Sequence, residues 1–337
     1  MDLLSKKIIS YAVLIINSFA AAAQLKWKNV DSLYQPLPSS IHIYYTTEPI
    51  DTAPFRAFYL IADLKDKNIL FDADTTKSRR FTPNQFYQKN NQPLVVVNCT
   101  FFSFQTNQNL NVVIKDGKQV GYNIHTIPRR GKDTLTYNHP FGSAIGISKK
   151  RNADIAWLLT DSSAKYAYAS QRTVKTLTDS IPMIDFEQAK GMRHSNRLHD
   201  LKYKHWKKTF KKWEVKTAVG GGPVLLQYGE IKISNNEELK FVGKAIDDKH
   251  PRTAMGYTKD GKLIILMIEG RNNVAHGAKL EQEAQILKDL GCWEALNLDG
   301  GGSSCMLVNG KETIKPSDAT GQRAVPAVFI IHSRGIK

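Results

Sequence analysis

The chain has 337 residues, of which 42% are hydrophobic and 23% charged, with 22 Gly and 13 Pro. This composition is typical of a globular protein with a buried core, and it excludes a disordered chain, a collagen and a disulfide-dense miniprotein. The 47 Lys and Arg residues outnumber the 31 Asp and Glu residues, which gives a formal net charge of +16. The surplus favours an anionic partner without identifying it, because nucleic acids, anionic glycans, phosphoesters and membrane surfaces are all negatively charged.

The first 23 residues have the pattern of a secretory signal peptide. Lys6 and Lys7 form a basic start, residues 8–16 are mostly apolar, and the alanines at 21–23 offer a cleavage site before Gln24. The apolar run is shorter than the roughly 20 residues that a membrane-spanning helix needs. We therefore expect a protein exported to the periplasm or secreted, with no stable membrane insertion after signal cleavage. An uncleaved membrane anchor is the alternative.

The mature chain is expected to form one catalytic domain. We place an N-terminal part, residues 24–90, packed on a main domain at residues 91–337. Four short β-rich runs are followed by glycine-containing turns, which is typical of hairpins. They are 112–114 before Gly117, 224–226 before Gly229, 255–257 before Gly261, and 306–308 before Gly310. The pattern predicts an α+β fold with mixed, largely antiparallel sheets built from hairpins and a few packed helices.

A basic segment at about 190–216 interrupts this pattern. It holds ten Lys and Arg residues against two acidic residues, and Trp206, Phe210 and Trp213 are interspersed among them. An aromatic residue at every third or fourth position suggests a helix that packs one side on the core. Two interpretations stay open, a solvated basic face and an insertion that binds a polyanion.

The clearest helix signal lies at residues 279–290. Leu280, Ala284, Leu287 and Leu290 follow helical spacing, and Gly291 is placed to end the helix. Glu283 within this segment is interpreted as a structural acid whose polar atoms have partners.

Three apolar runs end in a polar residue that is followed by glycines or aromatic residues. They are 94–98 before 99–102, 263–268 before 269–271, and 295–299 before 300–304. Strand ends hold loops in place while the loops reach solvent, so binding residues often collect there. A fourth glycine run, 220–222, precedes another strand. Consecutive glycines let backbone N–H groups approach an anion, although a tight turn or bulge explains a Gly-Gly pair more often than a ligand does.

Several chemistries are disfavoured. Neither glycine run continues into the Gly-Lys-Ser/Thr ending of a nucleotide-binding P-loop. The nine histidines lack a metal-binding spacing, and no Gly-x-Ser-x-Gly elbow of a serine hydrolase is present. We therefore expect no metal and no cofactor, and a nucleic-acid partner is not expected for an exported chain. The three cysteines allow at most one intramolecular bridge, and both a Cys99–Cys305 disulfide and reduced buried thiols stay open.

The order of these motifs resembles the phosphodiester glycosidase family. The matching pieces are an Asn-x-x-Phe-Phe segment, a Gly-Gly-Gly-Pro strand, Pro-Arg-Thr-Ala, an acid-Gly-Arg, a helix and Asn-Leu-Asp-Gly-Gly-Gly, and they extend from about Val95 to His332. Two of these motifs depart from the family pattern. Cys99 and Thr100 replace two glycines and are expected to narrow the pocket or change the preferred sugar. Glu269 replaces an aspartate and is one methylene longer.

The resemblance implies a hydrolase that cleaves sugar-1-phosphodiesters at the anomeric carbon, with N-acetylglucosamine-1-phosphodiester or a related bacterial glycan linkage as substrate. It implies Asp299 and Glu269 as catalytic carboxylates. The predicted substrate and phosphate contacts are Arg252, Thr253, Arg271, Asn98, Gly221, Gly222, Asn297, Gly301, Gly302, Ser303 and Ser304. A turn-forming role for Asp299 and an ion pair between Glu269 and a nearby Arg stay open. The alternative functions are a non-catalytic binder of anionic exopolysaccharide and a phosphodiesterase that cuts P–O.

Overall fold

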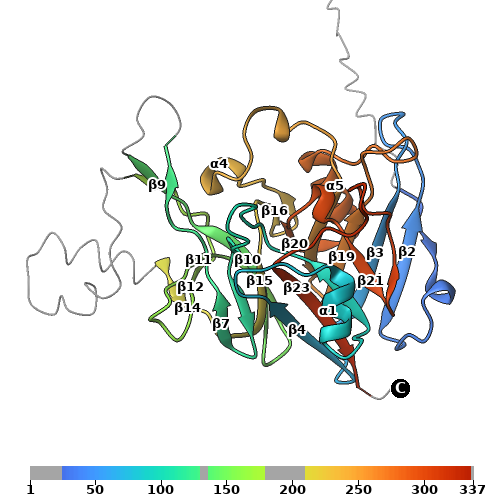
Figure 1. Ribbon diagram of the computed structural model, residues 1–337, viewed down its shortest axis with the longest axis horizontal. Coiled ribbons are helices and arrows are strands. Elements are labelled where there is room, and N and C mark those ends of the chain that lie inside the picture. The colour runs from blue at the N-terminus through green and yellow to red at the C-terminus, as the bar shows by residue number, and fades with distance from the viewer. Residues whose placement is uncertain (1–24, 130–135, 179–208, 335–337) are drawn as a thin grey trace, which may run out of the picture.

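The computed structural model describes residues 25–129, 136–178 and 209–334. The predicted signal peptide at 1–23 and most of the predicted basic insertion at 190–216 lie outside the described residues. The described strands form four sheets, and all their neighbouring strands pair antiparallel (Figure 1). The predicted fold class is therefore confirmed.

The largest sheet has the strand order β1-β2-β3-β19-β18-β20-β16-β17. Its strands are β1 (Lys28–Asn29), β2 (Ile41–Thr46), β3 (Ala57–Asp63), β16 (Val224–Gln227), β17 (Glu230–Ile231), β18 (Arg252–Thr258), β19 (Lys262–Ile268) and β20 (Cys292–Asn297). A second sheet has the order β22-β21-β5-β23-β4. Its strands are β4 (Ile69–Thr75), β5 (Val95–Asn98), β21 (Met306–Val308), β22 (Lys311–Glu312) and β23 (Ala327–Ser333).

The third sheet has the order β14-β12-β11-β10-β15-β6-β7, and a small fourth sheet has the order β13-β9-β8. Their strands are β6 (Val113–Lys115), β7 (Lys118–Gly121), β8 (Ile127–Pro128), β9 (Tyr137–His139), β10 (Gly142–Ser148), β11 (Ala153–Leu159), β12 (Tyr168–Ser170), β13 (Leu177–Thr178), β14 (Lys211–Lys212) and β15 (Val215–Gly220). The described helices are α1 (Pro83–Lys89), α4 (Asn235–Glu238) and α5 (Leu280–Asp289), with 3-10 turns η1 (Asp31–Leu33), η2 (Gly243–Ala245) and η3 (Gly301–Ser303).

The four predicted hairpins are confirmed as the pairs β6–β7, β16–β17, β18–β19 and β21–β22. The turn between β21 and β22 shows why its residues specify it. Asn309 and Gly310 both have positive φ, 49° and 76°, and Asn and Gly tolerate this conformation best. The predicted helix at 279–290 is confirmed as α5, which ends before Gly291 at φ 84°.

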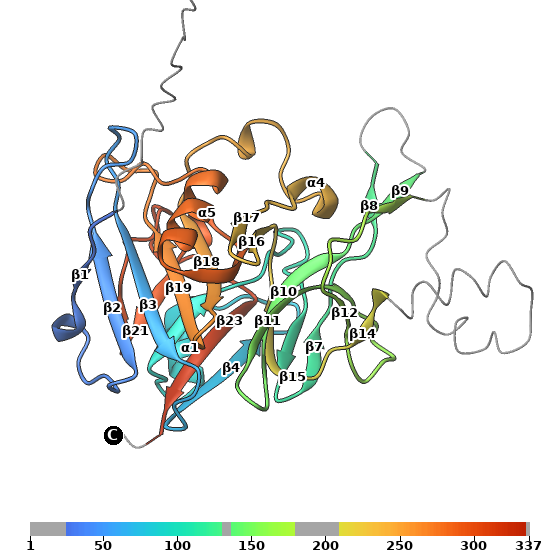
Figure 2. The same cartoon turned by 180° about the vertical axis from the view of Figure 1, so that it is seen from behind.

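The three larger sheets share one hydrophobic core. Strand β19 shows how side chains that alternate between the two faces of a sheet contribute to it. Leu263, Ile265 and Met267 point into this central core, whereas Ile264 and Leu266 point to the other face of the sheet. On that outer face, α5 covers the sheet with its buried residues, next to β16 and β20 (Figures 1 and 2). Helix α1 likewise packs on the outer face of the β5–β23 sheet.

The N-terminal strands belong to the same sheets as the rest of the chain. Strand β3 pairs with β19 over its whole length from Ala57 to Asp63, and β4 pairs with β23 over its whole length. Among the described residues, no helix is long and apolar enough to cross a membrane.

The helix suggested by the aromatic spacing is wrong from Lys211 onward, where the chain forms β14 and then β15. Phe210 is buried against Phe141, with ring centroids 5.3 Å apart, and Trp213 packs in the core of the third sheet. Trp213 shares that core with Val215, two residues later, which is the period of a strand. All three cysteines are free and buried, so the structure supports reduced thiols over a Cys99–Cys305 bridge.

Candidate functional site

Asn98 is fully buried at a point where three other chain segments meet β5, and it forms a hydrogen bond with each of them. It ends β5, and its Nδ2 donates to the backbone oxygen of Asp299 at 2.6 Å. Its Oδ1 accepts from Oγ1 of Thr253 and from the backbone N–H of Cys305, both at 3.0 Å. An amide side chain supplies the donor and the acceptor that this junction needs. Two residues that the sequence placed at strand ends, Asn98 and Asp299, are thus brought together, and Thr253 lies beside them.

Thr253 and Ser304 complete this junction. The hydroxyl of Thr253 lies 3.2 Å from Oγ of Ser304, and both side chains are buried. Ser304 follows η3, the turn formed by the glycine run after Asp299. The turn that carries Asp299 is thus fixed to β18 as well as to β5.

Asp299 has an environment that suits proton transfer near neutral pH. Burial raises its pKa to about 7, while the nearby hydroxyl of Ser303 and the cations Arg323 and Lys240 act against this shift. Ser303 Oγ makes no hydrogen bond of normal geometry among the described residues. A carboxyl group with a pKa near the working pH exchanges its proton most effectively. A turn-forming residue needs no such pKa, so this environment favours a chemical role.

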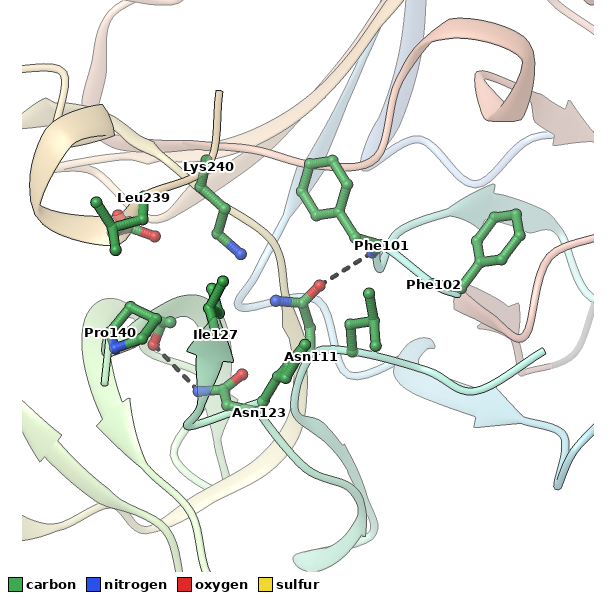
Figure 3. Close-up of a pocket in the computed structure, with 12 residues that line it drawn as sticks. Phe101, Phe102, Asn111, Asn123, Ile127, Pro140, Leu239 and Lys240 are labelled. Carbon is green, nitrogen blue, oxygen red and sulfur yellow. Dashed lines mark hydrogen bonds between the residues drawn. The ribbon is translucent and has the colours of Figure 1, made fainter. Parts of the chain in front are cut away.

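Lys240 brings its amino group to the edge of a pocket of about 240 Å³. Figure 3 shows its amino group pointing into this pocket, across from Asn111. Burial lowers the pKa of Lys240, and the carboxylates of Glu238 and Asp299 act against this shift. The side chain therefore lines the pocket and is also close enough to Asp299 to interact with its charge, so it can bind an anion that reaches both.

The pocket is mainly apolar. Its lining residues are Phe101, Phe102, Leu110, Asn111, Asn123, Ile124, Ile127, Pro140, Gly142, Glu238, Leu239 and Lys240. Its two asparagines are engaged by the backbone: Asn111 accepts from the Phe101 N–H at 3.0 Å, and Asn123 donates to the Gly142 oxygen at 3.2 Å (Figure 3). Pockets with apolar walls and few polar groups are typical of ligand sites.

Arg323 also lies close to the Asp299 turn. It forms a two-point ion pair with Asp318, with both N···O distances at 2.7 Å. This pair leaves no room beside Gly302, because a Cβ there would lie 2.1 Å from Asp318 Oδ1 and 2.2 Å from Arg323 Nη2. Gly302 thus allows a guanidinium to come close to the Asp299 turn.

Arg271 is exposed and lies against the same turn. A Cβ added to Gly301 would lie 3.1 Å from Arg271 Nη2, and this nitrogen is 3.4 Å from Nδ1 of His250. Arg271, Arg323 and Lys240 therefore approach the Asp299 turn from different elements. Such a set of cations is suited to a phosphate group.

Residues 91–332, more than half of the chain, match the family described as phosphodiester glycosidase. The chain belongs to the phosphodiester glycosidase family. Mouse N-acetylglucosamine-1-phosphodiester α-N-acetylglucosaminidase is 32% identical over 88 residues, which cover 26% of this chain and 17% of that protein. An uncharacterised prophage-derived protein of Bacillus subtilis is 37% identical over 82 residues, covering 24% of this chain and 13% of that protein. The matched segments are thus a minor part of these relatives' length.

Solved structures extend the likeness to most of the fold. The catalytic domain of zebrafish N-acetylglucosamine-1-phosphodiester α-N-acetylglucosaminidase aligns with a TM-score of 0.59 and 22% identity, over 89% of this chain and 86% of that one. An exported protein of Burkholderia pseudomallei aligns with a TM-score of 0.55 and 16% identity, over 85% and 75%. At these identities the likeness shows a shared phosphodiester glycosidase fold.

Other predicted residues of the family motifs have structural partners. Arg252 points away from Thr253, as neighbours on a strand do. Its guanidinium donates to the backbone oxygens of Ala278 at 2.9 Å and Asp248 at 3.3 Å, and the side chain is buried. Burial lowers the pKa of Arg252. These contacts do not favour the predicted contact between Arg252 and phosphate.

Glu269 is also engaged within the fold. It is 1% exposed, and its Oε1 accepts from Asn272 Nδ2 at 3.0 Å and pairs with Arg56 Nη1 at 3.4 Å. Its Oε2 accepts from the Lys315 N–H at 3.2 Å. These contacts support the ion-pair interpretation of Glu269 that the sequence left open.

The predicted glycine amides are largely used by the backbone. The N–H of Gly221 donates to Ser143, that of Gly222 to Asn297, and that of Gly301 to Pro251, at 2.7–3.0 Å. These three amides are therefore committed to the fold rather than to an anion. Asn297 is fully buried, and its Nδ2 donates to the oxygen of Gly222 at 2.8 Å, while its Oδ1 has no partner among the described residues.

The two departures from the phosphodiester glycosidase pattern do not line the pocket of Figure 3. Cys99 belongs to the central core, and burial raises the pKa of its thiol. Thr100 is 1% exposed and its hydroxyl lacks a partner among the described residues. No group of three or more potential metal ligands occurs in the described part of the chain.

Proposed function

We propose that this chain is an exported hydrolase that cleaves sugar-1-phosphodiesters at the anomeric C–O bond and releases a free sugar and a phosphomonoester. Family membership and the names of the mouse and zebrafish relatives support this reaction. They also make N-acetylglucosamine the first sugar to test, with other bacterial glycan linkages after it. The single observation that carries the proposal is the carboxyl group of Asp299, with a pKa of about 7, close enough to Lys240 and Arg323 for both to interact with its charge.

The cations are assigned to the phosphate. Lys240 and Arg323 lie close enough to Asp299 to affect its pKa, and Arg271 lies against Gly301 in the same turn. A phosphodiester carries one negative charge, and a guanidinium group binds phosphate oxygens through paired hydrogen bonds. Arg271, which pairs with no carboxylate among the described residues, is suited to this role, whereas Nε and Nη2 of Arg323 are held by Asp318, so Arg323 acts through its charge and its remaining N–H groups. Positive charge at this place also stabilises the second negative charge that forms on the leaving phosphate.

Asp299 is assigned as the base that activates water. The leaving phosphomonoester has a second pKa of about 6, so it departs at neutral pH without protonation. The site therefore needs a base more than an acid. In the proposed step, water forms a bond to the anomeric carbon and gives its proton to Asp299, while the C–O bond breaks and its electron pair stays on the phosphate oxygen. Ser303 Oγ, buried beside the carboxylate and without a partner of normal geometry among the described residues, is suited to orient this water.

The test uses ¹⁸O-labelled water and the purified mature protein without added metal. An α-N-acetylglucosamine-1-phosphodiester and a panel of other sugar-1-phosphodiesters are incubated, and the products are weighed by mass spectrometry. Label in the free sugar is expected. Label in the phosphate would assign the protein to the phosphodiesterases that cut P–O, and absence of product across the panel would favour a non-catalytic binder of anionic exopolysaccharide.

Export is part of the proposal. The support is the signal-like pattern of residues 1–23 and the exported relative from Burkholderia pseudomallei. Expression of the full chain in a bacterial host, followed by fractionation and mass measurement, is expected to give a periplasmic or secreted protein that begins at about Gln24. Retention of residues 1–23 in a membrane fraction would contradict this part.

A further inference from the structure

An exposed phenylalanine lies between two arginines beside the proposed site. Phe104 is 63% exposed, which is unusual for a large apolar side chain. The guanidinium carbon of Arg80 lies 5.4 Å from its ring centroid, and that of Arg323 lies 5.3 Å away. Phe102 packs against it at 4.7 Å and also lies 5.1 Å from Arg80. We call these four residues the arginine–phenylalanine rim.

Backbone hydrogen bonds order the loop that carries Phe102 and Phe104. The loop after β5 folds back on itself: Ser103 N–H donates to the Gln108 oxygen and Leu110 N–H to the Phe101 oxygen, both at 2.9 Å. Phe102 also forms an isolated β-bridge with Asn109. Phe104 is therefore presented to solvent on an ordered loop, so binding there needs little further ordering of the protein.

The rim adjoins both parts of the proposed site. Phe102 lines the pocket that Lys240 enters (Figure 3). Arg323 lies close to Gly302, and its charge lowers the pKa of Asp299. A ligand whose phosphate lies near Asp299 and whose sugar fills the pocket would continue along the rim with its other end.

The charges of the rim favour an anion. Arg323 is paired with Asp318, but no carboxylate in the described part of the chain pairs with Arg80. The whole chain has a formal charge of +16. A phenyl ring packs against the C–H face of a pyranose, and a free guanidinium binds phosphate or carboxylate. Together these groups match a sugar that carries negative charge.

We propose that the arginine–phenylalanine rim binds the leaving-group side of the substrate, and that this side is an anionic glycan rather than a small alcohol. The inference rests on the proposed function, because it takes the scissile phosphodiester to lie near Asp299. It names the substrate class as a glycan with further phosphate or carboxylate groups beyond the bond that is cut.

The experiment compares two substrates with the same N-acetylglucosamine. One is the methyl phosphodiester, and the other is the phosphodiester to an oligosaccharide that carries a phosphate on each residue. For Phe104→Ala and Arg80→Gln, the ratio of the two KM values, oligosaccharide over methyl, is expected to rise on the order of tenfold. Arg80→Gln is also expected to reduce the salt dependence of KM for the oligosaccharide substrate.

Two variants serve as matched controls. Arg79→Gln removes the neighbouring charge, whose guanidinium lies over Phe81 at 5.7 Å, outside the rim. Tyr228→Ala removes another exposed aromatic ring, 51% exposed, in the turn between β16 and β17. Neither is expected to change the KM ratio. Thermal melting of each variant checks that the fold is kept.

Three results would overturn the inference. The first is an unchanged KM ratio in the rim variants. The second is an oligothymidylate of equal charge that competes as strongly as the phosphorylated oligosaccharide, which would assign the rim to single-stranded nucleic acid. The third result applies if the wild-type protein cleaves neither substrate, in which case the proposed function fails and calorimetry tests the rim alone. This result is binding of the phosphorylated oligosaccharide that is equally tight in the wild type and in Phe104→Ala.

Discussion

Asn98 Nδ2 donates to the backbone oxygen of Asp299 at 2.6 Å, across 201 positions of the sequence and between two different sheets. Asn98 ends a strand of the β5–β23 sheet, whereas Asp299 follows β20 of the largest sheet. The hydrogen bond therefore fixes the position of the Asp299 turn relative to both sheets. Through Oδ1, the same side chain also holds Thr253 and the N–H of Cys305.

Replacement of Asn98 by Ala is expected to destabilise the fold and lower the activity together. It leaves the Cys305 N–H and the Asp299 oxygen buried without their partner, at a cost of about 2–4 kcal/mol. Urea unfolding measures this loss, with an unchanged m value. Asn84→Ala on the exposed side of α1 is the control and should lie within about 0.5 kcal/mol of the wild type. Equal stability of Asn98→Ala and the wild type would contradict the role of this junction.

Replacement of Asp299 by Asn is expected to lower kcat by about a thousandfold while the fold is kept. As the base, Asp299 acts only when it is deprotonated. With a pKa of about 7, it gives a kcat/KM that is low in acid and rises with pH through about 7. The bound phosphodiester adds negative charge, so the rise of kcat itself is expected at a higher pH. A pH-rate profile that instead falls through pH 7 would show that Asp299 acts as an acid.

Replacement of Lys240 by Met is expected to act on binding and on pH dependence at once. The loss of a cation from the phosphate site raises KM on the order of tenfold. Lys240 also lowers the pKa of Asp299, so its removal moves the rise of kcat/KM to higher pH. Lys244→Met, an exposed lysine in the following 3-10 turn, should show neither effect. A raised KM with an unmoved pH profile would show that Lys240 does not act on Asp299.

Replacement of Glu269 by Gln tests whether this residue has a structural or a catalytic role. The variant loses the charge that Arg56 faces and turns an acceptor into a donor beside Asn272 or the Lys315 N–H. We expect a loss of about 2–4 kcal/mol in the free energy of unfolding, and a drop in kcat far smaller than in Asp299→Asn. Glu237→Gln, an exposed acid in α4, is the control. A large drop in kcat at full stability would restore Glu269 as a catalytic residue.

Local sequence signals predicted the elements that carry the site. Turn residues such as Asn309-Gly310 and the helical spacing of α5 act over a few residues, so their structures followed from the sequence. The strand ends at Asn98 and Asp299 were also identified. The family resemblance predicted their roles in the site, and the structure shows the hydrogen bond between them.

Long-range geometry explains what the sequence did not predict. Lys240 and Arg323 lie outside every motif and reach Asp299 only through the fold. Arg252 and Thr253 are adjacent in the sequence but lie on opposite faces of β18. Arg252 is therefore buried against the Ala278 oxygen, whereas Thr253 contacts Asn98 in the site. Trp213 was assigned to a helix because its aromatic neighbours are three to four positions apart, although its core contacts follow the period of a strand.

Glu283 differs from its predicted role as a structural acid with partners. It is fully buried on α5, and both carboxylate oxygens lack hydrogen-bond partners among the described residues. Burial raises its pKa to about 8, while the charge of Arg252 acts against this shift. The group is therefore mainly neutral in the folded protein at pH 7 and ionised in the unfolded chain.

Replacement of Glu283 by Gln is expected to stabilise the protein in a pH-dependent way. Because the pKa of Glu283 in the folded protein lies above its ordinary value of 4.5, the wild type is most stable below pH 4.5 with respect to this group and loses that stability as the pH rises to about 8. Gln cannot ionise, so Glu283→Gln should be more stable by about 1–3 kcal/mol at pH 8, and the difference should shrink towards pH 5. Urea unfolding across this pH range measures it, with exposed Glu281→Gln on the same helix as the control. A difference that is constant with pH would show that Glu283 does not titrate between the folded and unfolded states.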